Sequence, residues 1–245
     1  MLHPEKARVT RELRRLARPA GEFDAQRYFR GPVDLAFYNI GTPATRALAR
    51  SIHAAHRDDW SLDDAVAFAD AMIVDRYLEA KTVGVEVLAR YHRAFTPRLL
   101  DTFKRWLAAD HSSNWATTDA MSMSLIGPIF LRYPEAADRM HVWSRHRNLW
   151  VRRASIVGLI PAIRKRLVLD LAYDIARRLH ADEADLIQKA VGWTLRECGR
   201  IDPRRLERYL RANGPGIPRT TVRYAIERFS EARRLALMRA TRNGS

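Results

Sequence analysis

Residues 114–119 read Asn114-Trp115-Ala116-Thr117-Thr118-Asp119. Trp115 and Asp119 are four residues apart, a spacing that places both side chains on one face of a helix, one turn apart. Ser113 and Asn114 are both residue types that cap the start of such a helix. An indole face attracts positive charge through its quadrupole, and a carboxylate attracts it by Coulomb's law, more strongly where water is excluded. The stretch therefore predicts a capped helical turn whose paired side chains suit a cation.

Two later segments again combine an aromatic and a charged side chain at helical spacing. They are Asn148-Leu149-Trp150-Val151-Arg152-Arg153 and Lys189-Ala190-Val191-Gly192-Trp193-Thr194-Leu195-Arg196-Glu197. The residues alone leave two interpretations open: one shared site, or three unrelated pieces of core. A lone tryptophan on a helix is more often core than ligand. The carboxylate of Asp119 favours a site, because a carboxylate is costly to bury without partners.

Helix-start signals and apolar periodicity run through the rest of the chain. Thr42-Pro43, Thr96-Pro97 and Asp202-Pro203 each place a capping residue before a proline suited to the first helical position. Further cap candidates are Ser61, Asn148 and Asp182. Apolar residues recur at spacings of three and four, as in Val66, Ala69, Ile73 and Tyr77 and in Ile187, Ala190, Val191 and Leu195. Strand signals are nearly absent, so the sequence predicts an all-α protein.

The spacing of the tryptophans suggests repetition. Trp115 and Trp150 are 35 residues apart, and Trp150 and Trp193 are 43 apart. Helical-hairpin repeats of the HEAT class run at roughly 40–47 residues, and stacked repeats curve to give a concave binding face. We therefore expect a HEAT-like helical-repeat solenoid with a basic concave face.

Composition points to a polyanionic partner. The chain has 245 residues, a formal net charge of +15 and a pI of about 10.7. Only five of the 43 basic residues are lysine, so arginine-rich codon usage is the alternative explanation. The charge is patterned, however: residues 204–245 carry eleven arginines against three glutamates, whereas residues 61–80 hold five acids and one arginine. Such patterning favours a nucleic acid partner.

Other features narrow the class of protein. The single cysteine, Cys198, excludes a disulfide framework and fits a cytoplasmic protein. No apolar run approaches the roughly 18 residues of a membrane span, so no membrane association is expected. No P-loop, dinucleotide-binding glycine motif or clear metal-ligand set is recognised, so the sequence predicts no nucleotide, metal or other cofactor.

Three segments are expected along the chain. Residues 1–30 form a basic N-terminal helical extension that is either a flexible arm touching phosphates or a solvated cap helix. Residues 31–241 form a single HEAT-like α-solenoid domain for DNA binding and catalysis. Residues 242–245 form a disordered tail.

The three tryptophan segments resemble the signature regions of AlkD-type alkylpurine DNA glycosylases, a DNA alkylation repair family. The matching patterns are Trp-x-x-x-Asp, Asn-x-Trp-x-x-Arg and Lys-Ala-x-Gly-Trp-x-Leu-Arg-Glu, in the order and spacing of the family. Ile40-Gly41-Thr42-Pro43 followed by Arg46, and Glu79-Ala80-Lys81, are also similar to the family. The resemblance covers roughly residues 36–230.

The resemblance implies a solenoid that clamps double-stranded DNA and releases N3- and N7-alkylated purines by hydrolysing the N-glycosidic bond. It implies that Asp119 is the catalytic carboxylate and that Trp115 and Trp193 are aromatic walls beside the lesion. It also implies DNA-binding roles for five residues: Arg153, Arg196, Arg152, Thr42 and Arg46. The expected partner is duplex DNA carrying alkylated purines, bound by a monomer at the nucleoid in the cytoplasm.

Two other classes of function stay open. The family has relatives thought to bind DNA without removing bases, so a non-catalytic HEAT-repeat protein that binds damaged or branched DNA is the main alternative. The presence of both Trp115 and Asp119 argues against it. A protein-interaction scaffold with an acidic partner is the third, and salt-dependent duplex binding would argue against that one.

Overall fold

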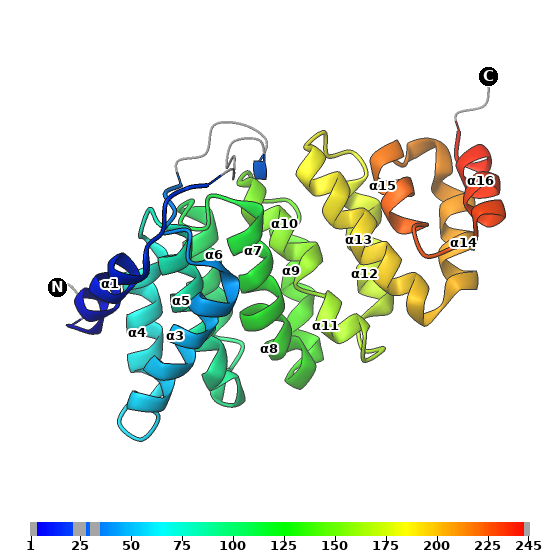
Figure 1. Ribbon diagram of the computed structural model, residues 1–245. Coiled ribbons are helices and arrows are strands. Elements are labelled where there is room, and N and C mark those ends of the chain that lie inside the picture. The colour runs from blue at the N-terminus through cyan, green and yellow to red at the C-terminus, as the bar shows by residue number, and fades with distance from the viewer. Residues whose placement is uncertain (1–3, 22–27, 30–34, 243–245) are drawn as a thin grey trace. The chain divides into compact units, whose positions relative to one another are not determined.

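The computed structural model describes residues 4–21, 28–29 and 35–242, and in these residues the prediction of an all-α protein is confirmed (Figure 1). The described residues contain no strand, and their only β-type pairing is an isolated bridge between Ala36 and Tyr77. The contacts group the chain into two compact units, Met1–Ile126 and Gly127–Ser245. The division falls inside the expected domain 31–241, and a continuous solenoid across both units stays a prediction.

The N-terminal unit is built from short helices. Its α-helices are α1 (Pro4–Leu16), α3 (Gly41–His56), α4 (Leu62–Ile73), α5 (Leu78–Leu88), α6 (Leu99–Ala108) and α7 (Trp115–Met121), with a 3₁₀ segment at Ala89–Ala94 and a π-helical turn at Ser122–Ile126. Helix α5 packs against α3, α4 and α7 and so occupies the middle of the unit. Its buried Val83 and Val87 join Phe68 and Met72 of α4 in the core.

Within the expected basic extension, residues 1–30, helix α1 packs on α4 and α5 as a cap helix. Val9 and Leu13 on one face are fully buried in the same core as α3 and α4. Arg8 and Arg15 are exposed; Arg8 pairs with Glu5, and Arg15 pairs with Glu12 at 2.7 Å. Burying two aliphatic side chains stabilises the docked helix by about 1.5–3 kcal/mol each. Within Pro4–Leu16 the cap interpretation therefore holds, and the arm interpretation does not.

The C-terminal unit continues the pattern of short packed helices. Its elements are α8 (Gly127–Arg132), α9 (Met140–Trp143), α10 (Leu149–Val157), α11 (Ile160–Ile163), α12 (Leu169–Leu179), α13 (Asp185–Ile201), α14 (Pro203–Asn213), α15 (Arg219–Ala225) and α16 (Glu231–Ala240), with 3₁₀ segments at Pro134–Arg139 and Gly214–Gly216. The longest of these, α13, packs against α10, α11, α12, α14 and α15. The predicted stripe Ile187, Ala190, Val191 and Leu195 is fully buried on α13.

Helix α13 approaches α15 closely at Gly192. A Cβ at this position would lie 2.4 Å from the Cβ of Tyr224 and 2.8 Å from the carbonyl oxygen of Thr221. Thr221 also donates a hydrogen bond of 2.9 Å to the carbonyl oxygen of Gln188, one turn earlier on α13. Glycine is therefore required here by backbone contact, directly before Trp193.

The cap predictions succeed where the side chain reaches an amide of the first turn. Ser61 forms a capping box with Asp64, and Asp202 accepts a hydrogen bond of 2.8 Å from the amide of Arg205. The predicted caps Thr42, Thr96 and Asp182 are wrong. Their helices are preceded by Ile40, Arg98 and Ala184 instead. Proline also tolerates the second or third helical position and ordinary turns, so its place fixes a helix start only to within a few residues. No helix in the described part of the chain is long and apolar enough to cross a membrane.

Candidate functional site

The turn that carries Trp115 and Asp119 is held by Asn114, the N-cap of α7. Asn114 is buried, and its side-chain oxygen accepts a hydrogen bond of 2.8 Å from the amide of Thr117. Its amide nitrogen donates to the carbonyl oxygen of Ser112 at 2.6 Å and to the hydroxyl of Thr117 at 2.9 Å. The residue before the cap, Ser113, has a φ of +49°, a left-handed conformation that is strained for a residue with a Cβ. The predicted cap is therefore Asn114 rather than Ser113.

Trp115 and Asp119 emerge from this fixed turn one helical turn apart, as predicted. Both are partly exposed, whereas the intervening Thr117 and Thr118 are buried. The helix continues directly into the π-helical turn Ser122–Ile126. Turns of this kind are rare and occur often at functional sites. The pair thus lies between the buried Asn114 cap and a π-helical turn.

Two aromatic side chains that the sequence reasoning missed lie against Trp115. The ring centroids of Tyr28 and Phe29 are 5.4 Å and 5.8 Å from that of Trp115, and Phe37 lies 6.1 Å from Phe29. Tyr28 is 52% exposed whereas Phe29 is buried, so the tyrosine is the member of the pair that faces solvent. In the sequence, Tyr28 and Phe29 are consecutive and lie close to the arginine-rich N-terminal stretch. The contact of Tyr28 with Trp115 spans 87 positions, which no local pattern predicts.

Glu79 and Lys81 belong to the segment Glu79-Ala80-Lys81, which was noted only for its similarity to the family. Their side chains hold the segments that lead into α3 and α7. Both are buried on α5. Glu79 accepts hydrogen bonds from the amides of Tyr38 and Asn39, at 3.0 Å and 2.8 Å, directly before the start of α3. Lys81 donates to the carbonyl oxygen of His111 at 2.7 Å, three residues before the Asn114 cap. The two side chains therefore anchor the approaches to α3 and α7.

Thr42 and Arg46, the predicted DNA contacts of the N-terminal unit, lie four residues apart in the first turns of α3. Both are exposed. The Nε of Arg46 lies 3.0 Å from a carboxylate oxygen of Glu86. An exposed pair of this kind contributes little to stability, about 0–1 kcal/mol. Both side chains are available to a partner, and their role in binding DNA stays a prediction.

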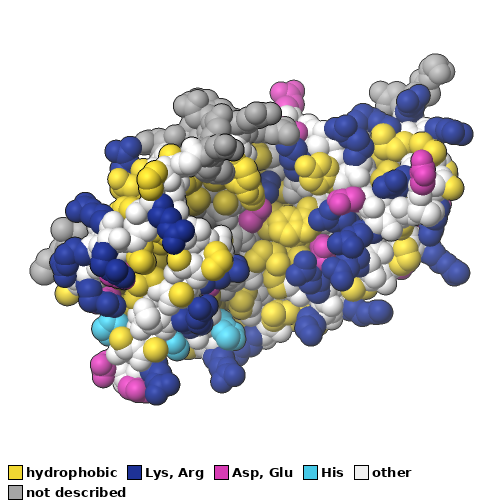
Figure 2. All heavy atoms as spheres, viewed as in Figure 1, with side chains coloured by type: hydrophobic (Ala, Val, Ile, Leu, Met, Phe, Trp, Pro, Cys, Tyr) yellow, Lys and Arg dark blue, Asp and Glu magenta, His cyan; other side chains and the backbone are white. Residues whose placement is uncertain are grey.

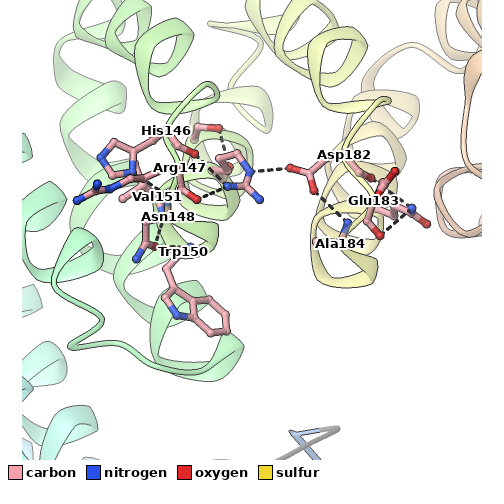
Figure 3. Close-up of polar contacts among 11 residues, drawn as sticks. His146, Arg147, Asn148, Trp150, Val151, Asp182, Glu183 and Ala184 are labelled. Carbon is pink, nitrogen blue, oxygen red and sulfur yellow. Dashed lines mark hydrogen bonds and ion pairs between the residues drawn. The ribbon is translucent and has the colours of Figure 1, made fainter.

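In the C-terminal unit, Arg152 ties the start of α10 to the loop before α13, and Figure 3 labels its partners His146, Arg147 and Asp182. Its Nε donates to Asp182 at 2.6 Å, and its Nη1 donates to the carbonyl oxygens of His146 and Arg147 at 3.0 Å and 2.7 Å. Asn148 caps α10 by accepting a hydrogen bond of 2.8 Å from the amide of Trp150. Arg152 was predicted to bind DNA, and the structure gives its guanidinium these three partners within the protein.

The two neighbours Arg152 and Arg153 have different environments. Arg153 is buried, and its guanidinium donates to the carbonyl oxygen of Leu186 in the first turn of α13. Trp150 is partly exposed, and its indole extends away from the Arg152 network (Figure 3). Arg153 therefore joins α10 to α13, and Trp150 contributes an aromatic surface beside this junction.

Helix α13 presents Trp193 and Arg196 on a partly exposed face. Arg196 pairs with Glu227. Glu197 is buried and binds Arg164 at 2.8 Å and Arg200 at 3.2 Å. Burial raises the pKa of Glu197, but the hydrogen bond from Arg164 and the surrounding guanidinium groups outweigh it and leave the pKa below its usual value. Glu197 therefore stays ionised and links α13 to its neighbours.

The structure thus brings together the predicted residues within each unit. Trp115 and Asp119 share a turn of α7, while Arg152 and Arg153 join α10 to the elements around Trp193. That the three tryptophan segments form one site stays a prediction. Within the described residues, no group of three or more His, Cys, Asp or Glu side chains is placed to hold a metal ion.

The described residues form an all-α protein whose helices α7, α10 and α13 carry tryptophan, carboxylate and arginine side chains. The chain belongs to the family of DNA alkylation repair enzymes, whose family model matches residues 9–229. It is similar in fold to a solved structure described as a predicted DNA alkylation repair enzyme from Enterococcus faecalis. The TM-score is 0.72 at 16% identity, covering 93% of this chain and 96% of that one. No curated protein matches the chain. The family makes this a DNA repair protein with DNA as its substrate.

Proposed function

We propose that the protein is a monofunctional DNA glycosylase that hydrolyses the N-glycosidic bond of cationic N3- and N7-alkylated purines in double-stranded DNA. The observation that carries the proposal is the placement of Trp115 and Asp119 one turn apart on α7, partly exposed, on a turn fixed by the buried Asn114 cap. In this proposal Asp119 is the catalytic residue, and Trp115 and Trp193 are the aromatic walls.

The chemistry of the substrate suits a carboxylate. Alkylation at N3 or N7 gives the purine a formal positive charge, so the base leaves as a neutral molecule and needs little acid catalysis. The sugar then develops oxocarbenium character, as in glycoside hydrolysis. A preorganised carboxylate such as Asp119 stabilises this cation and orients the water that attacks it. The water oxygen forms the new bond to the sugar carbon, the bond to the base nitrogen breaks, and one proton is released.

The aromatic surroundings add to the attraction for a cation. A cationic base or sugar over an indole face gains about 0.5–2 kcal/mol. Tyr28 lies against Trp115 and is itself half exposed, so it extends the aromatic surface at this turn. The proposal therefore includes Tyr28 as a further aromatic contact for the substrate.

The charge supports binding to duplex DNA. Lysine and arginine side chains are spread over the face of the molecule that Figure 2 shows, and the formal net charge is +15. The resemblance assigns DNA contacts to Arg153, Arg196, Arg152, Thr42 and Arg46. Arg46 and Thr42 are exposed, whereas Arg153 is buried, so we propose direct phosphate contacts for the first two and a positioning role for Arg153. We further propose that the protein acts as a monomer, on nucleoid DNA in the cytoplasm.

The test is release of 7-methylguanine and 3-methyladenine from methylated duplex DNA. Asp119→Asn keeps the shape of the side chain and removes its charge, so we expect base release to slow by about a hundredfold, the lower range for losing one such electrostatic group. Asp63→Asn, at an exposed position on α4, is the matched control and should release base at the wild-type rate. If the wild type binds duplex in a salt-dependent way and releases no base, the protein is instead a non-catalytic binder of damaged or branched DNA.

A further inference from the structure

The C-terminal unit contains an arginine-lined cavity of about 300 Å³. It is formed by the C-terminal half of α13, the start of α14 and the segment that joins α15 to α16. Among the described residues, four arginines and no carboxylate line it: Arg196, Arg200, Arg228 and Arg233. The remaining lining is mostly apolar and includes Leu206, Ala225 and Phe229. A cavity with cationic and apolar walls suits an anion, because weakly hydrated walls strengthen the electrostatic attraction.

The carboxylates around the cavity do not balance its arginines. Glu197 is shared between Arg164 and Arg200, and Glu207 is shared between Arg211, at 3.0 Å, and Arg233, at 2.6 Å. The third carboxylate, Glu227, pairs with Arg196. With Arg228, these groups are six arginines and three glutamates, a formal charge of +3, and four of the arginines line the cavity: Arg196, Arg200, Arg228 and Arg233.

Two of these arginines carry donors suited to a further ligand. The Nε of Arg196 is buried and has no hydrogen-bond acceptor among the described residues. An unsatisfied buried donor costs about 1–3 kcal/mol, so an acceptor there would be favourable. Arg228 is exposed and has no ion-pair partner in the part of the chain that the structure describes. Arg233 is held over the ring of Phe229 at 4.7 Å, which fixes one wall of the cavity.

We propose that this cavity binds a phosphate group, held by Arg196, Arg200 and Arg228. Guanidinium groups offer paired N–H donors that match two phosphate oxygens, and phosphate is the anion for which arginine is best suited. The cavity has room for a phosphate and part of an attached sugar. Arg196 lies one turn after Trp193 on α13, so a phosphate here would lie beside the tryptophan segment. The phosphate site itself is argued from the cavity alone. That the phosphate belongs to the backbone of duplex DNA rests on the proposed function.

The experiment uses the full chain, undamaged duplex DNA and inorganic phosphate. Arg228→Gln and Arg200→Gln each remove one charge from the cavity, and Arg178→Gln removes one from an exposed position on α12 as the matched control. Duplex affinity is measured against salt concentration, and inorganic phosphate binding is measured by ³¹P line broadening. Each phosphate contact contributes about 0.9 to the salt slope. Loss of one contact should therefore weaken binding about eightfold at about 0.1 M salt.

The outcomes separate the two sources of phosphate. A slope reduced by about 0.9 in Arg228→Gln, beyond any change in Arg178→Gln, supports a site for the DNA backbone. If the slope matches the control and only phosphate broadening is lost, the site takes free or terminal phosphate. If both cavity variants match the control in both measurements, the proposal is overturned. Circular dichroism checks that each variant is folded. Because no base is released in this experiment, its result is independent of the glycosylase test on Asp119.

Discussion

Replacing Asn114 by alanine should destabilise the protein far more than loss of an ordinary helix cap. An N-cap side chain contributes about 1 kcal/mol. Asn114 is only 2% exposed, however, and it makes three hydrogen bonds, two of them to backbone groups of Ser112 and Thr117. Each buried backbone group that loses its partner costs about 1–3 kcal/mol. We therefore expect Asn114→Ala to lower the free energy of unfolding by about 2–4 kcal/mol.

The assay is urea denaturation followed by circular dichroism, with two comparison variants. Ser61→Ala removes an exposed cap in the same unit and should cost about 1 kcal/mol. Asn114→Asp keeps the acceptor for the Thr117 amide and loses the donors, so it should fall between Asn114→Ala and the wild type. In the cold, where all variants are folded, base release should be slowed by Asn114→Ala and not by Ser61→Ala, because only the first loosens the turn that carries Asp119. Equal losses of stability in the two alanine variants would refute the argument that the buried cap holds this turn.

Three further predictions concern the C-terminal unit. Gly192→Ala should cost about 1–3 kcal/mol by forcing α13 away from the α15 backbone, whereas Gly199→Ala, whose Cβ would meet only the end of a flexible leucine side chain, should be nearly neutral in the same urea titration. Burial lowers the pKa of His180 from 6.5 to about 4, so the unfolded chain gains a proton before the folded protein does. Stability should fall by about 3 kcal/mol between pH 6.5 and 4, and His180→Gln should remove that loss. A double-mutant cycle on Arg152→Ala and Asp182→Ala should give a coupling of about 1–3 kcal/mol in thermal unfolding, and a coupling near zero would mean that the bridge does not tie the two loops.

The sequence predicted features that depend on neighbouring residues better than features that depend on contacts between residues far apart in the chain. The helices came from periodicity, and the stripe on α13 is buried as predicted, because a helix buries residues at fixed local spacing. Caps were predicted well where the side chain reaches an amide within three residues, as for Asn114 and Asp202. They failed at Thr42, which lies inside α3, and at Asp182, whose side chain accepts a hydrogen bond of 3.0 Å from the amide of Ala184, before the first turn of α13. The contact of Tyr28 with Trp115 was beyond prediction, because nothing local to either residue encodes it.

The motif Lys189–Glu197 contains both residues that support the fold and residues that are exposed to a partner. In Lys189–Glu197, Gly192 is required by the close approach of α15, and Glu197 is buried between arginines. Trp193 and Arg196 of the same motif stay partly exposed. The pattern alone could not separate residues that support from residues that contact a partner, since a helix face gives both the same spacing. Burial separates them, because a group that binds DNA has to reach solvent in the unbound protein.

Burial also distinguishes the adjacent residues Arg152 and Arg153 from the exposed arginines. The resemblance implies DNA-binding roles for both residues, yet the guanidinium of Arg153 is buried against the start of α13, and Arg152 is held by Asp182. Both side chains therefore fix where α13 begins, and with it the position of Trp193. A change at either residue should act on base release through the placement of that tryptophan. Substitution of Arg46 or Arg228 should instead act on duplex affinity and its dependence on salt.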